Sequence, residues 1–217
     1  MFDATTARRL MVDGQIRTAD VTDAALLDAM LTVPREQFLP PTLAPLAYVD
    51  ADIQVGKGRA LLRPMVLAKL LQAADIRAGE RVLDIGCATG YSAAILARLG
   101  ASVVALEEDA DLAKAARSAL AGAGVTNSEV VIGPLAAGWP AGAPYDLILL
   151  DGAAEIVPEA LGAQLKPEGQ LIGIGGRPPA LKGMIYRFIE GRFVGLPVFD
   201  AAAVLLPGFR APLSFVF

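Results

Sequence analysis

The most restrictive feature of this sequence is an absence, because none of its 217 residues is histidine and only one is cysteine. Without histidine, no Ser-His-Asp or Cys-His catalytic arrangement can form, and no histidine-ligated metal site. A single cysteine excludes an internal disulfide and a thiolate metal cluster, and it is typical of proteins in a reducing cytoplasm. We therefore expect no metal, and a reaction in which an external cofactor supplies the reactive group.

Long apolar runs and an excess of positive charge are also missing. Hydrophobic residues make up 54% of the chain and its mean hydropathy is +0.51, yet no run of about eighteen uncharged apolar residues occurs. We therefore expect a large core, no membrane span and, since residues 1–17 lack the apolar segment of a secretory signal, a cytoplasmic protein. The net charge of −4 leaves no basic surface for nucleic acid.

The most informative stretch that is present runs from Arg81 to Gly90. Apolar residues lead into Asp84, and a turn with Gly86 near its start and Gly90 at its end follows. The next residues, Tyr91–Leu99, have apolar side chains at helical spacing. A strand, a glycine-bearing turn and a helix in this order predict the nucleotide-binding start of a doubly wound α/β domain.

The spacing inside this turn distinguishes between cofactors. A dinucleotide fingerprint, G-x-G-x-x-G, places its last glycine five positions after the first, whereas here Gly90 follows Gly86 by four, with Ala88 between them. Glu107 ends the next predicted strand, where an acid can accept hydrogen bonds from a ribose diol. The pattern favours S-adenosylmethionine over a dinucleotide. An ordinary strand-to-helix turn and a purely structural role for Asp84 stay open as alternatives.

The rest of the chain alternates helices and strands. We predict helices at Thr5–Thr18, Val21–Thr32, Met65–Ala74, Tyr91–Leu99, Asp111–Ala123 and Ile156–Leu165, and an irregular glycine-bearing loop at Asp50–Pro64. We predict strands at Arg81–Ile85, Ser102–Leu106, Glu129–Ile132, Tyr145–Leu150, Gln170–Ile174, Met184–Glu190 and Leu213–Phe217, the last two pairing back at the sheet edge. Asp151 follows the fourth strand, so it should face the same cleft as Asp84 and Glu107, as a cofactor or substrate contact or as a helix cap.

The chain resembles the protein-L-isoaspartate O-methyltransferase family from about Met11 to the fifth strand of the predicted sheet. The resemblance rests on Met11 with Gln15 and Arg17, on the segment Ala29–Pro40 with its Val-Pro-Arg-Glu-Gln-Phe, on Val55–Gly58, on Val82–Tyr91 and on Glu107. It implies a Rossmann-like class I methyltransferase fold, α/β with a mixed seven-stranded sheet and an N-terminal helical extension. It also implies methyl transfer from S-adenosylmethionine to the side carboxylate of isoaspartyl residues, a step in protein repair.

Three segments depart from the family pattern. Its Thr-Ile-Ser-Gln-Pro reads Ala60-Leu61-Leu62-Arg63-Pro64 here, so both hydroxyl groups are missing and no catalytic residue can be assigned. Its Gly-Asp-Gly reads Gly133-Pro134-Leu135, without the acid that faces adenine, and its Thr-Ala-Ala reads Asp151-Gly152-Ala153-Ala154. We predict that Leu62, Arg63 and Pro64 border the substrate site and its lid. The predicted cofactor-binding residues are Asp84, Gly86, Cys87, Ala88, Gly90, Glu107, Leu135 and Asp151.

These observations leave several functions open. The acceptor is either an isoaspartyl protein or peptide or, because Arg63 is cationic, a different and anionic small molecule; a non-catalytic S-adenosylmethionine-binding module is a further alternative. A carboxylate acceptor suits a chain without histidine, because its pKa of about 4 leaves it ionised at neutral pH without a general base. We expect residues 1–76 to form the helical extension and lid, residues 77–217 to form the methyltransferase domain, and the protein to be a monomer or weak dimer.

Overall fold

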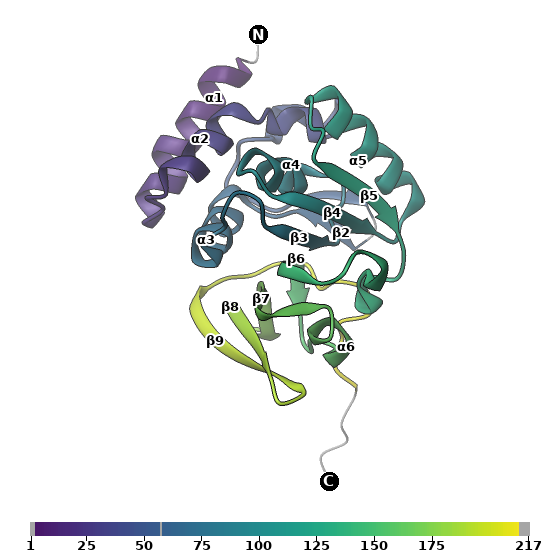
Figure 1. Ribbon diagram of the computed structural model, residues 1–217. Coiled ribbons are helices and arrows are strands. Elements are labelled where there is room, and N and C mark those ends of the chain that lie inside the picture. The colour runs from purple at the N-terminus through teal and green to yellow at the C-terminus, as the bar shows by residue number, and fades with distance from the viewer. Residues whose placement is uncertain (1–2, 57, 213–217) are drawn as a thin grey trace.

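The computed structural model describes residues 3–56 and 58–212 and contains a seven-stranded sheet in the order β5-β4-β3-β6-β7-β8-β9. Strands β3 to β7 pair in parallel, whereas β8 and β9 are antiparallel, so the sheet is mixed as predicted (Figure 1). Its strands are β3 (Arg81–Ile85), β4 (Ser102–Glu107), β5 (Ser128–Ile132), β6 (Tyr145–Ala154), β7 (Leu165–Arg177), β8 (Ala180–Ile189) and β9 (Arg192–Asp200).

The two faces of the sheet are covered by different parts of the chain. Successive residues of a strand point to opposite faces, and Val82 accordingly belongs to one apolar cluster while Leu83 belongs to the other. The first cluster includes side chains of α3 (Pro64–Ala74), α4 (Tyr91–Arg98) and α5 (Ala110–Gly122). The second includes Leu161 of the short helix α6 (Glu159–Gly162) and two residues of the C-terminal segment, Leu206 and Phe209.

The N-terminal residues form the predicted helical extension. Helix α1 (Ala4–Met11) continues through one π-helical turn (Val12–Ile16) and a 3-10 turn (Arg17–Ala19), and α2 (Ala24–Thr32) begins after Asp23, whose carboxylate accepts a hydrogen bond from Leu26 N at 2.8 Å. Both helices lie at the upper left of Figure 1, on the outer side of α3 and α4. Their buried side chains join the first apolar cluster. The extension is therefore continuous with the core of the sheet domain.

Two local predictions were wrong. The segment Asp50–Pro64 is not an irregular loop throughout, because β1 (Ile53–Gly56) and β2 (Arg59–Leu61) pair as an antiparallel hairpin with Ile53 opposite Leu61. The predicted helix Ile156–Leu165 is reduced to the single turn of α6. A proline precedes that turn, and Gly162 packs so closely on Phe188 that an added Cβ would lie 2.1 Å from its ring.

The end of the chain also differs from expectation. The predicted strand Met184–Glu190 is part of β8, but the strand that pairs with it is β9, which the sequence analysis missed because Gly195 and Pro197 interrupt its pattern. The predicted strand Leu213–Phe217 lies outside the described residues. Within residues 3–56 and 58–212, no helix is long and apolar enough to cross a membrane.

Candidate functional site

The predicted glycine turn connects β3 to α4 at the carboxyl edge of the parallel strands. Gly86, Ala88 and Gly90 all have positive φ angles, of 82°, 49° and 93°. Gly86 N donates to Leu106 O at 2.8 Å, which ties the turn to the end of β4. A Cβ at Gly90 would lie 3.3 Å from the Ala116 side chain, so glycine also permits close packing of the turn on α5.

Glu107 ends β4 with its side chain fully buried beside this turn. Its Oε2 accepts a hydrogen bond from Ala88 N at 2.9 Å, and its Oε1 accepts from Glu108 N at 2.9 Å and Asp109 N at 3.2 Å. Arg59 Nη2 also donates to Oε2, at 2.8 Å. The structure therefore brings the predicted ribose-binding acid to the glycine turn, with a cationic partner that the sequence analysis did not identify.

Asp84 and Asp151 share a third polar residue, Ser92. The Ser92 Oγ lies 2.7 Å from Asp84 Oδ2 and 2.8 Å from Asp151 Oδ2, and all three side chains are buried. One hydroxyl carries one proton and can donate to only one of the two carboxylates. The second short contact therefore requires a proton on one of the acids, which then donates to Oγ.

The environment of the two acids agrees with a retained proton. Burial raises the pKa of both carboxyl groups, and the charge of Asp151 raises the pKa of Asp84 further. Asp151 lies in β6 where its pairing with β7 shifts register between Leu149 and Ala153, and its side chain reaches Ser92 of α4. The Oδ1 atoms of Asp84 and Asp151 have no hydrogen-bond partner among the described residues, so both can accept from a bound donor.

Arg35, from the Val-Pro-Arg-Glu segment, forms the wall beside these acids. Its side chain is fully buried, Nε donates to Ala47 O and Nη2 donates to Leu62 O, each at 2.8 Å. Its guanidinium lies 4.6 Å from the centre of the Tyr91 ring, at the start of α4. Arg35 therefore connects the segment around Leu62 to the helix that follows the glycine turn.

The positions of the missing hydroxyl groups are apolar and inaccessible. Ala60 and Leu62 are buried, and Leu62 belongs to the apolar cluster under α3 and α4. Arg63 is about one-third exposed and pairs with Asp52 at 3.4 Å, and Pro64 is the first residue of α3. No polar side chain of the stretch 60–62 faces the acids, and the roles predicted for Leu62, Arg63 and Pro64 stay predictions.

The C-terminal segment covers the glycine turn from the other side. Leu206 N donates to Ala153 O at 2.9 Å, and a Cβ built on Gly86 or Gly152 would lie 3.0 or 2.7 Å from Leu206 Cδ2. Leu135 is buried in the same apolar cluster as Leu206. No local signal in the sequence identifies Leu206 as part of the site, because an isolated hydrophobic residue in a loop has no distinguishing pattern.

Cys87 is a buried structural residue of the turn. Burial raises the pKa of its thiol well above the ordinary value, and the neighbouring acids raise it further. The thiolate required for nucleophilic chemistry is therefore disfavoured.

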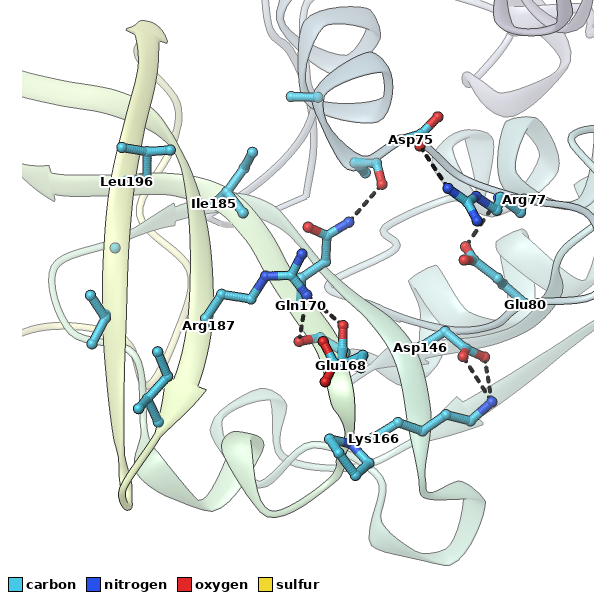
Figure 2. Close-up of a pocket in the computed structure, with 17 residues that line it drawn as sticks. Asp75, Arg77, Glu80, Asp146, Lys166, Glu168, Gln170, Ile185, Arg187 and Leu196 are labelled. Atoms are coloured by element: carbon cyan, nitrogen blue, oxygen red, sulfur yellow. Dashed lines mark hydrogen bonds and ion pairs between the residues drawn. The ribbon is translucent and has the colours of Figure 1, made fainter.

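A separate groove of about 990 Å³ lies at the opposite edge of the sheet, where β3 and β7 begin (Figure 2). Several of its polar side chains already have partners: Lys166 pairs with Asp146 at 2.8 Å, and Gln170 donates to Ala74 O at 2.6 Å. It contains none of the predicted site residues, which lie around the glycine turn.

Comparison with known proteins agrees with the geometry. The family model described as protein-L-isoaspartate(D-aspartate) O-methyltransferase matches residues 7–177. A protein-L-isoaspartate O-methyltransferase of Methylorubrum extorquens is 46% identical over 176 residues, covering 81% of this chain and 77% of its own. One from Methanoculleus marisnigri is 39% identical over 203 residues, covering 93% and 91%.

Solved structures show the same architecture. One named protein-L-isoaspartate O-methyltransferase has a TM-score of 0.78 at 25% identity, with 93% of this chain and 66% of that chain covered. A candidate protein-L-isoaspartate O-methyltransferase of Plasmodium falciparum, in complex with S-adenosyl-L-homocysteine, has a TM-score of 0.76 at 17% identity and shows the fold alone. With these matches, and with its glycine turn and Glu107 at adjacent strand ends, the chain belongs to the protein-L-isoaspartate(D-aspartate) O-methyltransferase family.

Proposed function

We propose that this protein transfers the methyl group of S-adenosylmethionine to the side carboxylate of isoaspartyl residues in proteins or peptides. The single observation that carries the proposal is the hydrogen bond of Ala88 N to Glu107, which joins a methyltransferase-type glycine turn to the acid of the neighbouring strand. Membership of the family and the names of the relatives support the acceptor.

The donor set fits S-adenosylmethionine, which supplies an electrophilic methyl group on a sulfonium when it is bound. Glu107 would accept hydrogen bonds from the ribose hydroxyls. The unpartnered Oδ1 atoms of Asp84 and Asp151 would accept from the ammonium group of the methionine part. Gly86 and Gly152 permit the close packing of Leu206 on this edge of the sheet, which a side chain at either position would block.

The chain's own residues then have little proton chemistry to perform. An isoaspartyl carboxylate is ionised at neutral pH, so the reaction needs no general base and can proceed without a histidine. The residues must hold the carboxylate oxygen in line with the methyl group and exclude water. The buried Leu62 and Leu206 would form apolar walls, and Arg63 would attract the anionic acceptor to the entrance.

A second candidate function follows from Ala60 and Leu62. Both are buried and apolar at the positions where the family resemblance implies hydroxyl groups. An acceptor other than an isoaspartyl residue, such as a small anionic molecule, or cofactor binding without transfer would suit this change.

The test uses radiolabelled S-adenosylmethionine with an isoaspartyl peptide and, as control, the same peptide with ordinary aspartate. Methyl ester formation, measured as methanol released after hydrolysis, is expected with the isoaspartyl peptide alone. Calorimetric binding of S-adenosylhomocysteine without any transfer would favour the second candidate. Absence of binding at high protein concentration would overturn both functions.

The remaining properties are part of the same proposal. We place the protein in the cytoplasm because its single cysteine suits a reducing compartment. We also assign residues 1–76 to the lid over the site, residues 77–217 to the methyltransferase domain, and a monomer or weak dimer to the protein in solution.

A further inference from the structure

Arg59 lies where a ligand of the glycine turn would have to lie. It begins β2, and its side chain is only 4% exposed. Its Nη2 donates to the carbonyl oxygen of Gly86 and to Glu107 Oε2, and its Nε lies 3.2 and 3.3 Å from the two Glu107 oxygens. A Cβ built on Gly86 would lie 2.6 Å from Nη2, so the guanidinium rests directly on the glycine that the turn keeps open.

The Glu107 carboxylate has no capacity left beside Arg59. A carboxylate offers about four lone-pair positions, and the amides of Ala88, Glu108 and Asp109 already donate to it. Arg59 occupies the remaining lone-pair position of the Glu107 carboxylate. The two hydroxyls of a ribose need the same oxygen atoms, so the guanidinium and the ribose cannot occupy Glu107 together.

We propose that Arg59 gates the cofactor site, and that its guanidinium must leave Glu107 and Gly86 before the ribose of S-adenosylmethionine can bind. This inference rests on the proposed function, because it concerns the same cofactor. A protein whose binding-competent state is only partly populated binds its ligand more weakly by that fraction. Arg59 therefore sets the cofactor affinity without contacting the cofactor.

Opening of the gate requires only that the Arg59 side chain move. The base of the β1–β2 hairpin is anchored on both strands, because Asp52 Oδ1 accepts from Arg63 N at 2.9 Å and Leu62 O accepts from Arg35 Nη2 at 2.8 Å. Once Arg59 leaves, the three backbone amides still donate to Glu107. The buried carboxylate of Glu107 therefore keeps hydrogen-bond donors, and the gate can open without unfolding the site.

The experiment is calorimetric titration with S-adenosylhomocysteine of the full-length wild type, Arg59→Gln and Arg98→Gln. The Arg98→Gln variant is the control, since it removes a surface cation that pairs with Asp28 at 3.0 Å instead. We expect Arg59→Gln to bind about tenfold more tightly, as for a competent state populated at about one in ten, and Arg98→Gln to bind as the wild type does. The thermal shift caused by the ligand should increase in parallel for Arg59→Gln.

An Arg59→Lys variant covers the case in which Arg59→Gln does not fold. Lysine keeps the charge beside Glu107 but has no second nitrogen to replace the Nε contacts with the carboxylate. It therefore holds Glu107 less firmly, and tighter cofactor binding than wild type is again expected. Equal or weaker binding by the folded Arg59 variants, with a wild type that binds, overturns the gate alone. Absence of binding by the wild type and both Arg59 variants overturns the proposed function, and the gate with it.

Discussion

The proton that Asp84 and Asp151 share should make the free energy of unfolding depend on pH, by an amount that can be worked out. Burial raises the pKa of Asp151 from 3.8 to about 6, because the ionised form loses its hydration and its Oδ1 has no partner among the described residues. Between about pH 4 and pH 6 the folded protein therefore keeps a proton that the unfolded chain has lost. Unfolding releases that proton, so the free energy of unfolding falls as the pH rises through this window.

The size of the effect follows from the same values. A rise in pKa from 3.8 to about 6 corresponds to about 3 kcal/mol. Asp151→Asn has no proton to lose, and it leaves the single hydroxyl proton of Ser92 to Asp84 alone. We expect this variant to have a flatter pH profile and to be more stable than wild type at pH 7.5, by up to about 3 kcal/mol.

Urea unfolding of the ligand-free protein at pH 5, 6 and 7.5 measures this difference. Asp146→Asn, on the same strand, is the control, because a backbone hydrogen bond from Arg81 and the Lys166 ammonium lower the pKa of Asp146 despite partial burial. That variant should lose stability at neutral pH, by less than about 1 kcal/mol for an accessible ion pair. Parallel profiles for wild type and Asp151→Asn, or a less stable Asp151→Asn at pH 7.5, would refute the shared proton.

Further predictions concern the glycine turn and the missing hydroxyl groups. Glu107→Gln should destabilise the protein by about 1–3 kcal/mol in urea unfolding, because an amide keeps one acceptor oxygen and leaves backbone amides that donate to Glu107 without a partner; unchanged stability would contradict a carboxylate held by these amides. Gly86→Ala should cost at least about 1–2 kcal/mol in urea unfolding, because its φ is 82° and its Cβ would meet Arg59; unchanged stability would contradict the close packing of Arg59 on the turn. Leu62→Ser combined with Ala60→Thr should raise isoaspartyl methylation, measured as methanol release, and no increase would place the acceptor determinant elsewhere.

Local signals explain the parts of the fold that the sequence predicted well. The turn from β3 to α4 depends on Gly86 and Gly90, whose positive φ angles favour glycine whatever surrounds them. The regular alternation of strands and helices likewise predicted the parallel strands β3 to β7, and the family resemblance implied the mixed seven-stranded sheet that the structure confirms. The hairpin of β1 and β2 was missed because strands of four and three residues show no periodicity.

The candidate site was predictable to the extent that it depends on strand ends. Asp84 and Glu107 lie at the ends of the neighbouring parallel strands β3 and β4, and Asp151 lies near the end of β6, which pairs with β3 on its other side, so the topology alone brings them to one edge. The Ser92 contact has a weaker signal, a hydroxyl side chain in the first turn of α4. Nothing local distinguishes Arg59 from Arg63, although the first is buried against Glu107 and the second is at the surface.

The sequence by itself determined the chemistry that is possible here: no histidine, a glycine turn of methyltransferase spacing, and acids placed to meet at one sheet edge. Only the tertiary structure decided what those acids contact. The contact of Arg59 with Glu107 spans 48 residues, and that of Ser92 with Asp151 spans 59. Such contacts depend on how the β1–β2 hairpin and strand β6 pack against the rest of the sheet. The partner of a charged side chain is set by which groups lie within its length and by burial, not by its neighbours in sequence.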